Sequence, residues 1–219
     1  MTRLIESSLT RLTDIMTEMG DMVIESISLA IDSYLNDNNT SDKVRLISHS
    51  ITKKYYEVED FTFEMFLKYQ PLGEDFRLIR SSTEISYAYA RFSRYAYDIS
   101  LLRDKFGNIS ECKNEYLSES VDKVMHMTKT AIQSFATLDI RTAVKIREDE
   151  EFIDCMYDER LLSLLKSSNT KCALTEALLL RYLERISDHA VFMSDAINYI
   201  VTGKHRPSDQ RIESRFVKK

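Results

Sequence analysis

Residues that interrupt helices are scarce in this chain, which has 4 glycines and 2 prolines among 219 residues. Globular proteins average roughly 7% glycine and 5% proline. A fold with many strands needs many tight turns, and such turns depend strongly on these two residue types. The scarcity therefore favours long helices joined by a few short connections.

Apolar residues recur at the helical spacing of three and four throughout the chain, and polar, Pro or Gly breaks separate six such segments. Thr40 or Ser41 is expected to cap the second helix, and Ser110 or Ser118 the fourth. The first predicted helix ends at about 36. The other five are predicted at about 42–69, 74–105, 110 or 118 to 137, 142–165 and 170–202.

Two parts of the chain resemble each other about one hundred residues apart. Ala30–Tyr34 aligns with Ala131–Phe135. An apolar 3-4-3 spacing also recurs, once as Tyr89, Phe92, Ala96 and Ile99 and once as Leu183, Ile186, Ala190 and Met193. That spacing is typical of the seam of an antiparallel bundle. We predict an all-α fold of two tandem three-helix bundles related by pseudo-symmetry, with repeats at 4–107 and 110–205 and a polar tail at 206–219.

Composition narrows the function classes. The sequence has no run of about 18 apolar residues that could span a membrane. The formal net charge of −5 does not favour nucleic-acid binding, and the N-terminus lacks a signal-peptide core, so we expect a cytoplasmic protein. The three cysteines (Cys112, Cys155 and Cys172) are odd in number and have no CxxC spacing. We predict isolated structural thiols, with neither a disulfide framework nor a zinc site.

Two pairs of acids lie in apolar surroundings. Glu184 and Asp188 lie four apart beside core positions of the last helix, and Glu150 and Asp154 lie four apart on the preceding helix. Acids at this spacing share a helix face, and hard cations bind carboxylate oxygens. With 35 acids in the chain, chance alone gives about five or six such pairs. By pattern alone a solvated patch, or one paired with Arg185, is therefore favoured over a metal site.

The tyrosines near residue 90 permit two interpretations. Tyr87, Tyr89, Tyr95 and Tyr97 could line an interface, because tyrosine suits half-buried surfaces. The favoured interpretation places them in the core and at its rim on the third helix.

Several segments resemble the PhoU family of phosphate-uptake regulators. The strongest, Arg181–Ala190 (RYLERISDHA), is similar to the family's LERIGDHA signature, and the resemblance covers residues 4–205. The other matching segments are Met16–Val23, Gln70–Arg77, Asp139–Val144 and Ile200–Lys204. This resemblance implies two three-helix bundles related by pseudo-symmetry.

The resemblance also implies metal ligands, because members carry E(D)xxxD pairs that bind multinuclear clusters. By position, Glu150, Asp154, Glu184 and Asp188 match the second-repeat set and are expected to bind divalent or iron-type ions. Phe192 replaces a frequent Asn of the family. The matching first-repeat positions are Ser48, Thr52, Ala90 and Arg94. An arginine there opposes a cation directly, so no metal site is expected in the first repeat.

The function implied by the resemblance is that of a non-enzymatic cytoplasmic adaptor, acting peripherally at the inner face of the membrane. It restrains a phosphate transporter through a cytoplasmic component of that transporter, signals to a sensor kinase in many bacteria, and is expected to be a homodimer. Neither a catalytic residue nor a cofactor-binding loop is expected, because the sequence shows no P-loop, nucleophile elbow or kinase signature. The alternatives are a metal-dependent carboxylate enzyme and a purely structural helical dimerisation module.

Overall fold

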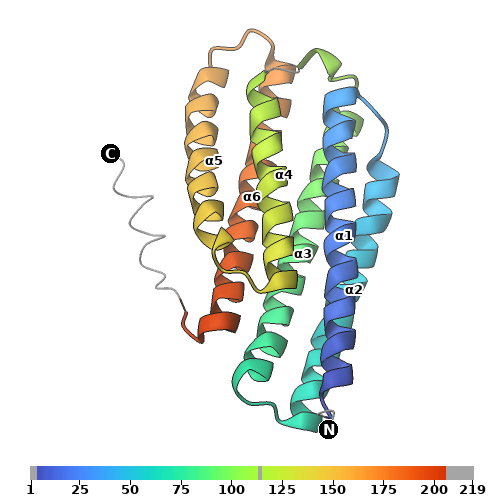
Figure 1. Ribbon diagram of the computed structural model, residues 1–219. Helices are drawn as coiled ribbons and strands as arrows, with labels where there is room; N and C mark the ends of the chain where they lie inside the picture. The colour runs from blue at the N-terminus through green and yellow to red at the C-terminus, as the bar shows by residue number, and fades with distance from the viewer. Residues whose placement is uncertain (1–3, 113–114, 206–219) are drawn as a thin grey trace.

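The computed structural model describes residues 4–112 and 115–205, and within them the chain forms six long α-helices and one short 3-10 turn (Figure 1). The all-α prediction is confirmed, and the helices begin and end close to the predicted positions. They are α1 (Glu6–Asn36), α2 (Ser41–Tyr69), α3 (Gly73–Phe106), η1 (Ser110–Cys112), α4 (Glu115–Thr137), α5 (Thr142–Leu164) and α6 (Thr170–Thr202).

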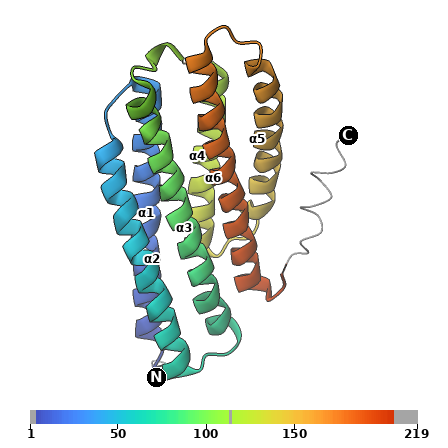
Figure 2. The same ribbon diagram turned by 180° about the vertical axis from the view of Figure 1, so that it is seen from behind.

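The helices are arranged as two groups of three, α1 to α3 and α4 to α6, which lie side by side (Figures 1 and 2). The groups meet where α3 packs against α6 and α1 packs against α4. In the described residues α2 contacts only α1 and α3, and α5 contacts only α4 and α6. These two helices therefore form opposite edges of the molecule, as both views show.

Residues that the sequence placed in the bundle seam are buried. The four seam residues of α3 and the four of α6 are each fully buried or nearly so. Truncating a residue of this kind to alanine typically costs about 2–5 kcal/mol. The 3-4-3 prediction of the core is thus confirmed on both helices. Of the nearby tyrosines, Tyr89 is fully buried, Tyr95 and Tyr97 are half-buried, and Tyr87 is 44% exposed.

Of the predicted cap residues, Thr40 stands at the N-cap position of its helix, and none of them is seen to form a cap bond in the described residues. Thr40 precedes α2, but its hydroxyl donates to the carbonyl of Leu29 at 2.9 Å and makes no cap bond. Ser110 begins η1, and Ser118 lies inside α4. A cap of another type begins α6, where the Asn169 side chain accepts from the N–H of Cys172 at 3.1 Å. A polar side chain near the start of a helix can bond to another backbone group instead of capping the helix, so local sequence alone does not determine which residue forms the cap.

Gly20 lies at a point of close contact between α1 and α4. A Cβ added there would lie 2.8 Å from Cγ2 of Ile132, which is shorter than a normal carbon contact. The glycine is buried in the middle of α1 and is needed for the packing of one half against the other. A residue that weakens helices is kept here because it permits close helix packing.

The prediction of isolated thiols is wrong for two of the three cysteines. Cys112 and Cys172 form a disulfide with their Cα atoms 5.0 Å apart. The bond ties η1, in the connection between the halves, to the first turn of α6. The two residues are 60 apart in sequence, so no spacing rule could pair them. Cys155 takes part in no disulfide within the described residues and is half-buried.

No helix in the described part of the chain is both long enough and apolar enough to cross a bilayer. The predicted polar tail, 206–219, lies outside the described residues.

Candidate metal centre

Glu184 and Asp188 lie one turn apart on α6 and are more deeply placed than the sequence suggested. Glu184 is 4% exposed and Asp188 9% exposed. The sequence put them at the border of the bundle, next to Leu183 and Ile186, which are fully buried. A charge this deep must be compensated, because transferring it from water costs several kcal/mol.

Arginines supply that compensation. Arg185 donates two hydrogen bonds to Glu184, from Nε to Oε2 at 2.6 Å and from Nη2 to Oε1 at 2.5 Å. The same guanidinium reaches Oδ2 of Asp188 at 2.9 Å, and Arg181 Nη1 lies 2.8 Å from Oε2 of Glu184. The hydrogen bond to Glu184 raises the pKa of Arg185 above its usual range. The Arg185-paired patch, one of the two readings of the sequence, is therefore present.

Glu150 and Asp154 are half-buried on α5, the helix packed against α6. The structure thus places the two acidic pairs on neighbouring helices, as predicted. It does not draw them into one tight cluster. Among the described residues, the group whose ligand atoms all lie within 4.8 Å is Glu111, Cys112 and Cys172, and its two sulfurs are bonded to each other.

The corresponding part of the first half contains no carboxylate at the four matching positions. Ser48 Oγ of α2 lies 3.4 Å from Ser93 Oγ of α3. Thr52 donates to the carbonyl of Ser48 at 2.9 Å, a bond within α2. Arg94, 58% exposed at its side chain, pairs with Asp98 one turn along α3. Small hydroxyls and a surface ion pair take the place of the buried acids.

Aromatic rings surround the signature histidine where α3 meets α6. The His189 ring centroid lies 5.8 Å from that of Tyr95, 6.2 Å from Tyr87, 6.3 Å from Phe92 and 6.5 Å from Phe192. Phe192, which replaces a frequent Asn of the resembled family, therefore belongs to an apolar cluster beside the acids. This packing makes Phe192 a core-rim residue.

Sequence reasoning missed two ion pairs that join α5 to α6. Arg147 pairs with Asp195, and Arg160 pairs with Glu176, which is only 3% exposed. The available signal was an acid on the apolar stripe of α6 that an arginine of the antiparallel α5 could reach. These two contacts make the interface of α5 and α6 ionic.

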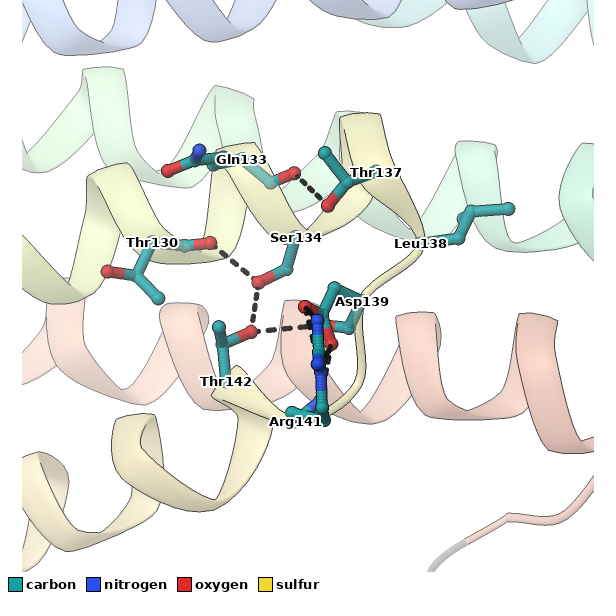
Figure 3. A pocket seen from close by; sticks show the side chains of 8 residues that line it. All are labelled: Thr130, Gln133, Ser134, Thr137, Leu138, Asp139, Arg141 and Thr142. Carbon is teal, nitrogen blue, oxygen red and sulfur yellow. Dashed lines mark hydrogen bonds and ion pairs between the residues drawn. The ribbon is translucent and has the colours of Figure 1, made fainter.

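A pocket of about 600 Å³ lies at the joint between α4 and α5, and none of the four candidate acids lines it (Figure 3). Its polar groups bond to one another: Ser134 donates to the carbonyl of Thr130 at 2.7 Å, and Thr142 donates to that of Asp139 at 3.0 Å. Asp139 accepts from both the N–H and the side chain of Arg141. These bonds lower the pKa of Asp139 to about 2. The pocket is a capped turn and offers no metal ligands beyond one paired acid.

Carboxylates on two packed helices are a donor set that suits hard divalent cations, so the chemistry of the second-half acids fits such an ion. In this arrangement Arg185 holds oxygens of both Glu184 and Asp188. An ion that used those oxygens would have to displace the guanidinium. Binding would then be a competition between two cations for one set of carboxylates.

Fold and site define a class: an all-helical protein of two packed three-helix groups, with an acidic and arginine-rich interface in the second group. The family model described as the PhoU domain matches residues 16–102 and 117–197. The chain belongs to the PhoU family.

Curated relatives agree with this assignment over most of their length. A protein of Synechocystis called phosphate-specific transport system accessory protein PhoU homolog is 24% identical over 91% of this chain and 92% of its own. A Thermotoga maritima relative with the same description, homolog 1, is 26% identical over 91% and 90%.

Solved structures show the same fold. The crystal structure of PhoU from Pseudomonas aeruginosa superposes with a TM-score of 0.85 at 21% identity, over 91% of this chain and 100% of that chain. PhoU from Streptococcus pneumoniae gives 0.83 at 17% identity, over 93% and 99%.

Proposed function

We propose that this protein is an accessory regulator of a phosphate-specific transport system. The observation that carries the proposal is that the family model matches segments in both halves, 16–102 and 117–197. Curated relatives matched over about nine-tenths of both chains bear the accessory-protein description. The regulator acts in the cytoplasm, peripherally at the inner face of the membrane, and restrains the transporter through its cytoplasmic component.

The fold suits an adaptor. Helices of about 30 residues are about 45 Å long at 1.5 Å per residue, so each side of the bundle offers an extended and rigid surface. A protein that binds one conformation of a transporter more tightly than another shifts the balance toward that conformation. Restraint of uptake then needs no chemistry from the adaptor. A sensor kinase is a second proposed partner, and the working form is a homodimer.

A pull-down combined with uptake assays tests the proposal. Tagged protein from phosphate-fed cells is expected to retain a cytoplasmic component of a phosphate transporter. Deleting the gene is expected to raise phosphate uptake under phosphate excess, and the wild-type gene is expected to restore restraint. Unchanged uptake in the deletion strain, with no transporter component retained, would contradict the proposal.

We further propose that Glu150, Asp154, Glu184 and Asp188 bind a divalent or iron-type ion when Arg185 turns away. The support is the donor set and the burial of the two α6 acids. Elemental analysis of protein purified without chelator is expected to find metal, and Asp188→Asn is expected to remove it. Asp14→Asn is the matched control, because Asp14 is an exposed acid four residues before Glu18. Equal metal content in all three proteins would contradict this site.

We also propose that the protein is not an enzyme. Both acids of α6 are engaged by arginines, which occupy carboxylate oxygens that a general base would have to present to a substrate. Metal-loaded protein is expected to give no turnover of a phosphate monoester above a sample carrying Asp188→Asn. Turnover that Asp188→Asn abolishes would support the rival carboxylate enzyme.

A further inference from the structure

The outer face of α2 carries an exposed stripe of residues at alternating spacings of three and four. All of its members are exposed, and they occupy one side of the helix for about six turns. We call this set the α2 stripe, and it consists of Leu46, His49, Lys53, Tyr56, Asp60, Phe63 and Leu67. Alternation of three and four over this length is the spacing of a coiled-coil seam.

The large apolar members of the stripe are unusually open to solvent. Leu46 is 60% exposed, Tyr56 58%, Phe63 65% and Leu67 68%. The buried side of α2 packs against α1 and α3, and among the described residues no helix of the second half contacts it. The helix α2 therefore lies at a free edge of the molecule (Figures 1 and 2), and the exposed stripe runs along it. A row of exposed apolar side chains of this kind marks an interaction surface.

The charges in the stripe indicate which partner fits it. Lys53 lies on the N-terminal half and Asp60 on the C-terminal half, seven residues apart. Neither forms an ion pair within the part of the chain that the structure describes. Two copies of α2 packed in parallel would place lysine on lysine and aspartate on aspartate. Packed antiparallel, the copies place opposite charges together.

The antiparallel register brings four of the seven stripe residues opposite one another in two kinds of pair. A two-fold axis between Tyr56 and Glu57 places each residue of α2 opposite the residue of the second copy that lies equally far along the helix on the other side of the axis. Lys53 then faces Asp60 of the second copy, and Leu46 faces Leu67 of the second copy. The same axis sets His49 opposite Glu64, which is also exposed. An isologous contact of this kind closes on itself and stops at a dimer.

We propose that the α2 stripe is the homodimer interface of this protein, with α2 packed antiparallel against α2 of a second copy. The proposal goes beyond the proposed regulatory function by naming the face, the partner and the register. It does not depend on the transporter or on metal.

Charge exchange tests the register. Sedimentation equilibrium of the full chain is expected to show a dimer. Lys53→Glu alone and Asp60→Lys alone are each expected to weaken dimerisation at least tenfold. The reason is that the two-fold axis places each substitution at two points of the interface, where like charges then face each other. The double variant K53E/D60K is expected to recover the wild-type constant within about threefold. An equimolar mixture of the two single variants is expected to form the mixed dimer, since each then supplies the charge that the other lacks.

A matched pair of apolar substitutions tests the face. Phe63→Glu is expected to give a monomer, whereas Leu162→Glu, at a 69%-exposed leucine of α5, is expected to stay dimeric. Both positions are exposed, so neither change should unfold the protein, and circular dichroism checks this. A monomeric wild type at 100 µM would overturn the proposal. So would a dimer that is insensitive to Phe63→Glu, or single charge variants that the double variant does not rescue.

Discussion

The second and third helices of each half pack in the same manner but are joined by different chemistry. Between α2 and α3, Ser48 lies near Ser93 and Thr62 near Thr83, while Arg94 pairs with Asp98 within α3. Between α5 and α6, Arg147 pairs with Asp195 and Arg160 pairs with the buried Glu176. Within α6, Arg185 holds Glu184 and Asp188. The first pair depends on close packing of small residues, and the second on compensated charges.

This difference shows what an acidic pair on a helix means. Spacing of four brings two carboxylates to one face in either half. Where the face is buried, as on α6, the chain supplies arginines to both acids, because a buried carboxylate without a partner is very costly. Burial and compensation, more than spacing, distinguish the acids of α6 from the solvated pairs elsewhere.

The disulfide should give the largest effect, and it ties the connection between the halves to α6. Cys112→Ser opens a loop of 60 residues, and loop-closure entropy for that length corresponds to about 4 kcal/mol. We expect the free energy of unfolding of the Cys112→Ser variant to be lower than that of oxidised wild type by up to that amount, as measured by urea denaturation. With dithiothreitol present the two proteins should coincide. Equal stability without reductant would show that the bond contributes nothing.

Arg185 and Arg94 make the sharpest comparison of the halves. Arg185→Met leaves Glu184, 4% exposed, with less compensation, so we expect a loss of about 3 kcal/mol. Arg94→Met removes a largely exposed pair and should cost less than about 1 kcal/mol. Chemical denaturation measures both. Similar losses for the two variants would mean that the halves do not differ in the way described.

Alkaline pH should weaken the first half through its buried tyrosines. Burial raises the pKa of Tyr34 to about 12, while its hydroxyl donates to Thr175 of α6 at 3.4 Å. This folded-state pKa lies above the unfolded value of about 10. The contribution of Tyr34 to the free energy of unfolding is therefore complete below pH 10 and is lost between pH 10 and 12. We expect stability to fall by about 2 kcal/mol over that range, and less steeply in Tyr34→Phe. Identical pH profiles of wild type and variant would contradict this role.

Gly20→Ala probes the contact that joins the halves. The added methyl group would meet Ile132 at 2.8 Å, and overpacking typically costs about 1–3 kcal/mol. The better helix propensity of alanine offsets up to about 1 kcal/mol of that, so we expect a net loss of about 1 kcal/mol by thermal denaturation. The double variant with Ile132→Ala should recover stability relative to Ile132→Ala alone. A stabilised single variant would show that α1 and α4 can separate freely.

Much of this fold could be predicted because its determinants are local and periodic. The scarcity of glycine and proline indicated long helices, and the 3-4-3 spacing on α3 and α6 identified residues that are all buried. The disulfide could not be predicted, because its cysteines meet only after η1 folds against α6. The same limit applies to the pairs of Arg147 with Asp195 and Arg160 with Glu176, which depend on the rotation of α5 about its axis.

The candidate site was predicted in part. The acids of α6 were singled out by their apolar neighbours, and Arg185 was recognised as an available partner. Sequence could not say how far Glu150 and Asp154 would stand from them, because that distance is set by packing between helices. Whether an ion binds depends on its competition with Arg185, and this is a balance of energies that residue identity does not fix.

The most direct test of the comparison between the halves is a count of bound manganese by native mass spectrometry. We predict that wild type binds metal at one site only, and that D154N/D188N binds none. Introducing acids at the matching first-half positions, S48E/T52D/A90E/R94D, should create a second site and raise the count. Metal retained after D154N/D188N would contradict the account, as would a wild type that binds no metal or fills a site in each half.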